Sequence, residues 1–294
     1  MIEGIKTLPQ NPELIGQAEL IEHIQYSKNG QELSLLLPWA PNDDRTGRNK
    51  CPLILFVQGS AWTCPNLGYE IPMLSHYAEE GFVVATIRHR SRLDGYPAPA
   101  FLEDAKCALR FLRANADLYA IDKERVCAFG TSSGGNTVCL LGVTGDDPSY
   151  RNGEYESESD SVSCVVSCFA PTDLFAFFGE SFSHLEELPE AKEFHSTLFG
   201  TTDPALLPDA AKAISPVYLV KEGKTYPPFL LLHGTGDPVV PYSQMESFYN
   251  TLKAHHAEVL AYCVDGAEHE GNFWSPAVRD VIHEEIYRHL VSEN

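Results

Sequence analysis

The chain has 294 residues, 44% of them hydrophobic, and a formal net charge of −20 at neutral pH. This length and composition allow a sizeable core and exclude wholesale disorder. Proteins that bind nucleic acids or anionic membranes need basic patches, and this strongly acidic composition argues against them. We therefore expect no nucleic-acid or membrane partner. The sequence shows neither a signal peptide nor an apolar run of roughly 18 residues, and we therefore expect a cytoplasmic protein.

The first predicted element is an antiparallel hairpin. Apolar-rich runs at 23–27 and 32–40 flank Asn29-Gly30, a dipeptide typical of tight hairpin turns. Further along, nearly continuous apolar runs predict strands that are buried on both faces, which is typical of a parallel sheet covered by helices. These runs are at 51–59, 82–90, 125–132, 162–173, 227–238 and 258–269.

Amphipathic helix patterns separate several of these strand runs. The clearest are at 100–116, 243–255 and 275–291, where apolar residues recur at helical spacing and form one stripe. Alternating strand and helix patterns after a hairpin predict an α/β fold with a mostly parallel, doubly wound sheet. No linker, repeat or charge block divides the sequence, so we expect a single domain over residues 1–294.

One segment, 174–219, breaks the alternation. It is rich in aromatic and acidic residues and stands between two strand runs. We interpret it as a cap-like insertion over the carboxyl edge of the sheet, where the loops of α/β folds form binding sites.

The eight cysteines give no indication of disulfides or of a metal site. Most lie inside apolar runs, as reduced core thiols do in a chain without an export signal. Cys164 and Cys168 have no second close pair with which to form a zinc site. We expect no metal and no cofactor.

The motif that carries chemistry is Gly130-Thr131-Ser132-Ser133-Gly134, between a strand run and a helix-compatible run. It fits the G-x-S-x-G pattern of a nucleophile elbow, and of its two serines only Ser132 has glycine two residues before and two after. A sharp, strained turn of this kind exposes a serine hydroxyl near the positive end of the next helix. We therefore predict that Ser132 is a nucleophile and not part of an ordinary glycine turn.

A serine nucleophile needs a base and an acid that orients the base. On this kind of sheet the expected order is serine, acid, histidine, and in this sequence Asp237 and His269 each follow a strand run in that order. Asp173 is the second candidate acid, although an aspartate in its position is also typical of a helix N-cap. We expect His233 to pack beneath the site and the histidines at 255–256 to face solvent.

Together these motifs resemble those of the α/β-hydrolase esterases and lipases. The turn 58–62, GTSSGGN, DPVVP and GAEH are similar to the acetyl- and feruloyl-esterase-like BD-FAE group, over about residues 32–290. Such a fold needs an oxyanion hole, which would consist of the Ser133 backbone N–H and an N–H of Ser60 or Ala61, of which we favour Ser60. Members usually carry His-Gly-Gly-Gly-Trp where this chain has Gln-Gly-Ser-Ala-Trp, so the backbone geometry of that turn is open.

Aromatic and basic residues near the predicted site are candidate substrate contacts. Arg90 belongs to the charged run 88–92, and the others are aromatic. Each can equally belong to core packing or to an ion pair. The four candidates are Trp62, Tyr96, Arg90 and Trp274.

The first functional hypothesis is a serine carboxylester hydrolase that acts through an acyl-enzyme on short-chain or aromatic acyl esters. The resemblance implies acetyl or feruloyl groups on plant saccharides. We expect a small-molecule or saccharide ester as the partner, and the sequence leaves a monomer and a homodimer equally open. An exopeptidase, an amidase or an aryl formamidase with the same triad is an alternative. A catalytically inactive hydrolase fold that only binds is the alternative from another class.

Overall fold

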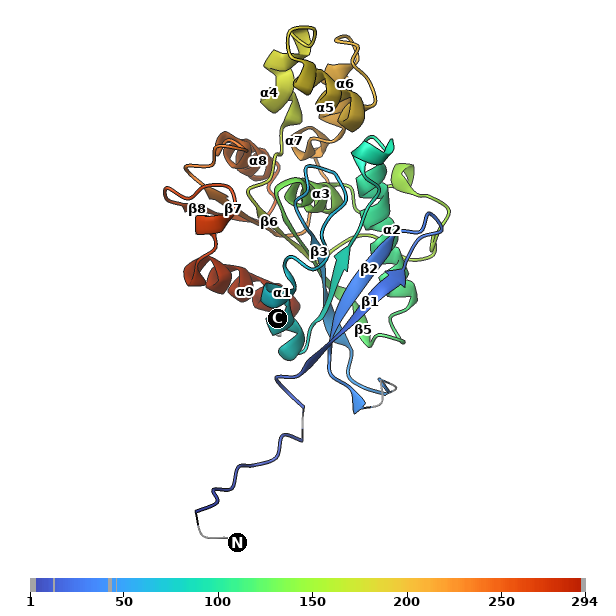
Figure 1. The fold of residues 1–294 in the computed structure, drawn as a ribbon, viewed down its shortest axis with the longest axis vertical. Helices are drawn as coiled ribbons and strands as arrows, with labels where there is room; N and C mark the ends of the chain where they lie inside the picture. Colours follow the sequence, from blue (N-terminus) through green and yellow to red (C-terminus); the bar gives the residue numbers. More distant parts are fainter. Residues whose placement is uncertain (1–3, 13, 42–43, 46, 292–294) are drawn as a thin grey trace.

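The computed structural model describes residues 4–12, 14–41, 44–45 and 47–291. They contain an eight-stranded sheet with the order β1-β2-β4-β3-β5-β6-β7-β8 (Figure 1). β3 to β8 run parallel, whereas β1 and β2 form an antiparallel hairpin and β2 pairs antiparallel with β4. The α/β fold predicted from the sequence is confirmed. The strands are β1 Ala18–Gln25, β2 Glu32–Pro38, β3 Cys51–Val57, β4 Val83–Ile87, β5 Ile121–Thr131, β6 Cys164–Cys168, β7 Phe229–Gly234 and β8 Val259–Val264.

Side chains of the central strands alternate between two cores, one on each face of the sheet. In β3, Leu53, Leu55 and Val57 belong to one core, and Ile54 and Phe56 belong to the other. Because both faces are covered, almost every position of such a strand is apolar and buried. This arrangement explains why the sequence shows continuous apolar runs instead of an alternating pattern.

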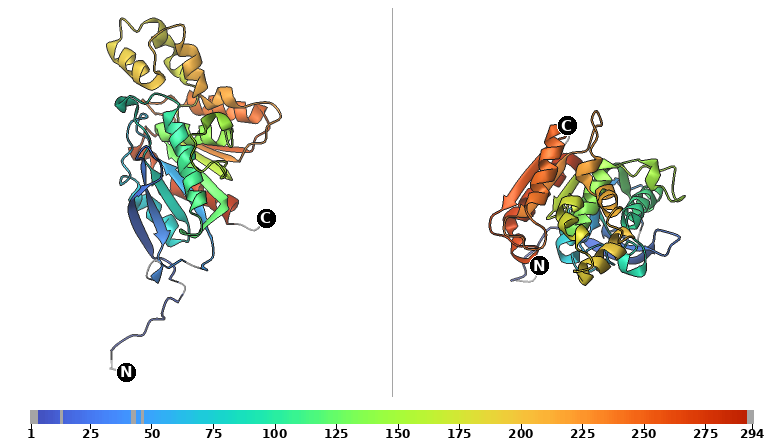
Figure 2. Two further views of the ribbon diagram at one scale, coloured as in Figure 1. Left: turned by 90° about the vertical axis from the view of Figure 1, so that its right-hand side faces the viewer. Right: turned by 90° about the horizontal axis from the view of Figure 1, so that it is seen from above.

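Helices cover both faces of the sheet (Figures 1 and 2). α2, α3 and α8 contribute side chains to the first core, and α1 and α9 to the second. The helices beside the sheet are α1 Ile71–Glu79, α2 Ala100–Ala114, α3 Ser132–Val143, α8 Ser243–Ala254 and α9 Pro276–Leu290, with the short 3-10 helices η2 Arg92–Asp94, η3 Pro148–Tyr150 and η5 Gly271–Phe273.

Four of these helices were predicted. The patterns at 100–116, 243–255 and 275–291 correspond to α2, α8 and α9, with ends that differ by at most two residues, and the helix-compatible run of the Ser132 motif corresponds to α3. α1 was not predicted, because it buries only Leu74, Tyr77 and Ala78 and therefore carries a weak apolar stripe.

Residues 174–219, which we call the cap, fold into short helices above the carboxyl edge of the sheet (Figure 1). The rings of Phe178, Phe182 and Phe199 surround the buried His195 at centroid distances of 5.2, 5.2 and 5.5 Å. Among the residues described here, no helix has the length and apolar character needed to cross a membrane. The cap elements are α4 Leu174–Phe178, η4 Gly179–Ser183, α5 Pro189–Phe199, α6 Leu207–Ala213 and α7 Pro216–Leu219.

Candidate active site

The nucleophile elbow lies where β5 ends and α3 begins. Ser132 is the first residue of α3 and has a φ of 51°, which non-glycine residues rarely adopt. The motif glycines have no room for a side chain: a Cβ on Gly130 would lie 2.6 Å from the carbonyl carbon of Gly134, and a Cβ on Gly134 would lie 2.6 Å from that of Val57. The strained turn thus holds Ser132 at the carboxyl edge of the sheet, at the positive end of α3.

Ser132, His269 and Asp237 form a continuous hydrogen-bonded line. The Nε2 atom of His269 lies 3.0 Å from Ser132 Oγ, and its Nδ1 atom lies 2.7 Å from Asp237 Oδ2. The three residues follow the ends of β5, β8 and β7, which meet at one edge of the sheet. An ionised carboxylate only accepts hydrogen bonds, so Nδ1 carries the proton and Nε2 can accept the proton of the serine.

Asp237 is buried and satisfied by several donors. Its Oδ1 atom accepts the backbone N–H groups of Val239 and Val240 at 2.8 and 2.9 Å. Its Oδ2 atom lies 3.3 Å from Nε2 of His233, which also donates to the Val240 carbonyl at 2.9 Å. Burial opposes the charged form, but the hydrogen bonds from His233, His269 and the backbone outweigh it and hold the pKa of Asp237 well below its ordinary value. Asp237 is therefore an anion that can orient His269.

The turn after β3 lies directly against the elbow. A Cβ on Gly59 would come within 2.6 Å of Ser132 Cβ. The Ser133 hydroxyl oxygen accepts the backbone N–H of Ser60 at 2.9 Å and that of Trp62 at 3.2 Å. The residue after the nucleophile thus fixes this turn through its side chain.

Two residues of this turn adopt the left-handed conformation that usually requires glycine. Ala61 has a φ of 49° and Trp62 a φ of 58°. The Trp62 indole N–H donates to Asn136 Oδ1 of α3 at 3.3 Å, and the Ser133 hydroxyl holds the Trp62 N–H. Within the described parts of the chain, the backbone N–H groups of Ala61 and Ser133 have no hydrogen-bond acceptor. These two amides are therefore the free donors at the elbow, whereas the N–H of Ser60 is occupied.

Arg92 of η2 connects this turn to the cap. Its Nε atom donates to the Ala61 carbonyl at 2.9 Å, and its Nη1 atom donates to the Thr197 hydroxyl of α5. The guanidinium carbon lies 4.3 Å from the ring centroid of Phe194, also in α5. One side chain therefore contacts both the turn beside Ser132 and the cap above it.

The competing candidates occupy other positions. Asp173 caps α4, because its Oδ1 atom accepts the N–H of Ala176 at 2.9 Å, while its Oδ2 atom accepts the Tyr218 hydroxyl at 3.3 Å. His255 lies at the C-terminal end of α8, with Nδ1 2.8 Å from the Thr251 carbonyl. Asp237 is thus the acid that contacts His269.

The four candidate substrate contacts, Trp62, Tyr96, Arg90 and Trp274, lie in different environments. Trp62 is 3% exposed and its ring packs into the core. Arg90 is engaged in an ion pair with Asp104, and the exposed Tyr96 ring lies 5.6 Å from the guanidinium carbon of Arg90. Trp274, by contrast, lines a cavity near the loop that carries His269.

In the parts of the chain that are described, no three histidine, cysteine or acidic side chains are grouped as a metal ion would need. Cys164 and Cys168 lie in β6, where both are buried as free thiols.

The sequence of this chain matches the model of a known protein family. The BD-FAE model matches residues 42–252, which is well over half of the chain. The chain belongs to the BD-FAE family. The resemblance drawn from the elbow, the turn and the histidine loop is thereby confirmed.

Curated proteins similar to this BD-FAE family member include esterases. The chain is 29% identical over 242 residues to Esterase LipC of Mycobacterium tuberculosis, a match that covers 80% of this chain and 56% of LipC. It is 24% identical over 239 residues to isoprenylcysteine alpha-carbonyl methylesterase ICME of Arabidopsis thaliana, with 78% and 52% covered. The chain spans about half the length of these relatives.

Solved structures show the same fold. A truncated carbohydrate esterase from gut microbiota matches with a TM-score of 0.75 and 26% identity, covering 94% of this chain and 98% of that one. A bifunctional GH43-CE protein of Bacteroides eggerthii matches with a TM-score of 0.77 and 26% identity, covering 92% of this chain and 35% of that one.

The sequence did not reveal three contacts that support this site. His233 was expected beneath the site, but its contact with Asp237 Oδ2 was not foreseen. The Ser133 hydroxyl was not considered as an acceptor, although Ser60 and Trp62 both donate to it. Arg92 lies in the charged run that was noted, yet its partner Thr197 is 105 residues away and no local signal reveals it.

Proposed function

We propose that this BD-FAE family member is a serine carboxylester hydrolase. The observation that carries the proposal is the hydrogen-bonded line from Ser132 Oγ through His269 to the anionic Asp237. The esterase names of its relatives and the carbohydrate esterase of similar structure support the same chemistry.

In the proposed reaction, Ser132 Oγ attacks the ester carbonyl carbon while His269 Nε2 takes the hydroxyl proton. The carbonyl electron pair moves to the oxygen, and the tetrahedral intermediate collapses to an acyl-enzyme. The departing alcohol receives the proton from His269. Water then attacks the acyl-enzyme by the same proton route, which releases the acid and restores Ser132.

The developing oxyanion needs preorganised donors. We propose the backbone N–H groups of Ser133 and Ala61, because the N–H of Ser60 already donates to the Ser133 hydroxyl. This assignment changes the sequence-based preference from Ser60 to Ala61. The Ser133 side chain would then position the turn while its own amide binds the oxyanion.

For the substrate class, we propose short acetyl or aromatic feruloyl groups esterified to saccharides. The support is the similarity, at 26% identity, to a carbohydrate esterase that this chain covers almost completely. The cap consists of short helices, the longest being α5 with 11 residues, and lacks a long apolar helix of the kind that covers the site of a lipase.

The test compares wild type, Ser132→Ala and a matched control, Ser247→Ala on α8. Hydrolysis of p-nitrophenyl acetate, butyrate, octanoate and methyl ferulate gives the acyl preference. Ser132→Ala should lower kcat by on the order of 10⁴-fold or more, and Ser247→Ala should leave it unchanged. Wild type should also react with a fluorophosphonate, in which Ser132 Oγ displaces fluoride from phosphorus, and Ser132→Ala should not.

Each outcome decides between the hypotheses. Labelling without ester hydrolysis would contradict the esterase proposal and favour amide or formamide substrates. Absence of both labelling and hydrolysis would favour the binding-only alternative. Ester hydrolysis that survives in Ser132→Ala would remove Ser132 as the nucleophile.

A further inference from the structure

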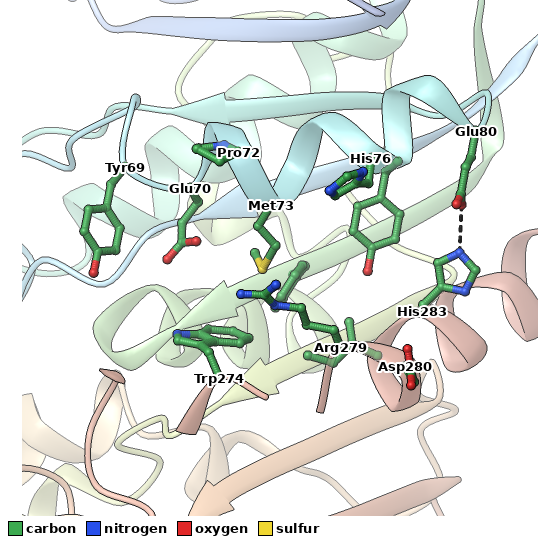
Figure 3. Close-up of a pocket in the computed structure, with 13 residues that line it drawn as sticks. Tyr69, Glu70, Pro72, Met73, His76, Glu80, Trp274, Arg279, Asp280 and His283 are labelled. Atoms are coloured by element: carbon green, nitrogen blue, oxygen red, sulfur yellow. Dashed lines mark hydrogen bonds and ion pairs between the residues drawn. The ribbon is translucent and has the colours of Figure 1, made fainter. Parts of the chain in front are cut away.

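A groove separates α1 from α9 on one face of the sheet, outside the hydrogen-bonded line of the triad. It has a volume of about 710 Å³, within the range of about 300–1,000 Å³ typical of small-molecule sites. Its lining at the carboxyl edge of the sheet includes Tyr69, Glu70, Trp274 and Arg279 (Figure 3). At the far end, the groove is closed by the hydrogen bond of 2.7 Å between His283 Nε2 and Glu80 Oε2.

The open end of the groove adjoins the loop that carries His269. Trp274 lies on this loop, and its indole N–H donates to Glu270 Oε2 at 2.8 Å. The ring of Phe169 lies 4.7 Å from that of His269 and 6.0 Å from that of Trp274. Two contacts therefore lead from the catalytic histidine to the wall of the groove.

Two polar side chains face the groove without protein partners. Glu70 is only 9% exposed, and Figure 3 shows its carboxylate pointing into the space beside Trp274. Within the described residues, neither the Glu70 carboxylate nor the Arg279 guanidinium has a hydrogen bond or an ion pair. Arg279 is exposed to solvent, whereas Glu70 is mostly buried, so its carboxylate needs water or a ligand in the groove to satisfy it. Burial and the nearby Glu270, partly offset by Arg279, raise the pKa of Glu70 to about 7.

The chemistry of the lining selects the kind of ligand. The lining carries the carboxylates of Glu70, Glu80 and Asp280, with Glu270 nearby, and these oppose an anion. A purely apolar ligand would leave Glu70 and Arg279 without hydrogen bonds. A neutral hydroxyl-rich ring avoids both costs, because each hydroxyl both donates and accepts. Its C–H face also suits the flat, partly exposed indole of Trp274.

We propose that the α1–α9 groove binds a neutral saccharide unit, with its hydroxyls on Glu70 and Arg279 and its ring against Trp274. This inference rests on the proposed saccharide-ester function, because the groove would then hold sugar residues next to the esterified one. The hydrogen bond between Glu80 and His283 bounds the end of the groove away from Trp274.

The first experiment measures binding without hydrolysis. Unesterified xylotetraose, cellotetraose and mannotetraose are titrated into the full chain, with calorimetry and tryptophan fluorescence as readouts. At least one should bind, and both Glu70→Gln and Arg279→Gln should weaken that binding by about tenfold or more, because each loses a hydrogen bond to a charged group. The controls, Glu284→Gln and Arg288→Gln, lie on α9 outside the groove lining and should bind as wild type does.

A second experiment measures selectivity. The kcat/KM ratio for acetylated xylotetraose over p-nitrophenyl acetate should fall by about tenfold in Arg279→Gln and stay constant in the controls. Thermal unfolding of each variant identifies any that fail to fold.

The results separate the groove from the esterase proposal. Ester hydrolysis without binding of any of the three sugars overturns the groove and leaves the esterase. Sugar binding that is unchanged in both groove variants places the sugar elsewhere and also overturns the proposal. Groove-dependent sugar binding without ester hydrolysis supports the groove and contradicts the esterase.

Discussion

Two carboxylates in this chain, Asp237 and Asp160, are buried in similar ways and serve different ends. The side chains of both are fully buried, and each contacts two basic side chains. Asp160 lies 2.7 Å from Lys106 Nζ and 2.7 Å from Arg110 Nη1, both of α2 and both fully buried. Asp237 lies between His233 and His269.

The two carboxylates differ in the other hydrogen bonds that their basic partners make. Lys106 also donates to the Thr144 carbonyl at 2.6 Å, and Arg110 to the Glu154 carbonyl at 3.1 Å, so the network ends in fixed backbone. His269 instead has a second nitrogen that faces Ser132, and its side chain is 13% exposed. A buried carboxylate thus fixes loop structure when its partners are cations that also bond backbone carbonyls. It supports chemistry when one partner is a histidine whose second nitrogen can exchange a proton with another side chain.

The strongest test of this contrast is Asp237→Asn. An asparagine cannot hold Nδ1–H of His269 as a carboxylate does, so kcat for p-nitrophenyl acetate should fall by on the order of 10³–10⁴-fold. The unfolding midpoint should change much less than the activity. A variant with near wild-type kcat would show that Asp237 has no orienting role.

Asp160→Asn should have the opposite profile. It leaves Lys106 and Arg110 buried without their carboxylate, which should lower the free energy of unfolding by about 3–5 kcal/mol. Urea unfolding measures this loss, and kcat per folded molecule should stay at the wild-type value.

The matched control for Asp160 is Glu158→Gln, which breaks an ion pair with the half-exposed Lys123 and should cost about 0–1 kcal/mol. A loss of activity per folded molecule in Asp160→Asn would mean that the two carboxylates are not separate in function.

Ser133→Ala tests the neutral contact beside the nucleophile. Here a single hydroxyl holds a turn, whereas charged side chains hold the loops around Asp160. The N–H groups of Ser60 and Trp62 lose their shared acceptor, and Ala61 and Trp62 remain at positive φ. We expect kcat to fall by roughly 10–100-fold with a small change in KM. An increase in kcat would instead show that the freed Ser60 N–H acts as an oxyanion donor.

Glu70 gives the smallest effect, because it is a mostly buried carboxylate without a hydrogen bond or ion pair among the described residues, and only the nearby Arg279 partly offsets its burial. Its pKa is raised from 4.5 to about 7, so the folded state binds more protons than the unfolded state between those pH values. Stability from this group therefore falls as pH rises through that window. Glu70→Gln should remove this fall and stabilise the protein at pH 8 by on the order of 1 kcal/mol after solvent screening. Thermal unfolding at pH 5 and pH 8 checks it, and equal slopes for both proteins would contradict it.

Much of the fold could be predicted because it depends on local pattern. Strands buried on both faces must be apolar throughout, so β3 and β5 stand out in the sequence, and Asn29-Gly30 indicates the hairpin. The place of β4 between β2 and β3 is set by side-chain packing between distant segments, and no local signal encodes it. The sequence predicts an insertion at 174–219, but the ends of its short helices depend on packing around His195 and were not predicted.

The site divides in the same way. Ser132, Asp237 and His269 could be named because each follows a strand, and parallel strands bring their carboxyl ends to one edge. The Ser133 hydroxyl and Arg92 act through contacts with residues 31 to 105 positions away, which a sequence pattern does not reveal.

Arg92 also joins the cap to the turn that follows β3. It binds the Ala61 carbonyl and, at the same time, Thr197 and Phe194 of α5. Coupling between two sites is reciprocal. We therefore expect a ligand that stabilises the turn to favour the position of α5 in which Arg92 bonds Thr197. We expect a displacement of α5 to weaken the hydrogen bond between Arg92 and the Ala61 carbonyl. We therefore expect a substitution in α5 that displaces Arg92 to shift the Ala61 carbonyl as well.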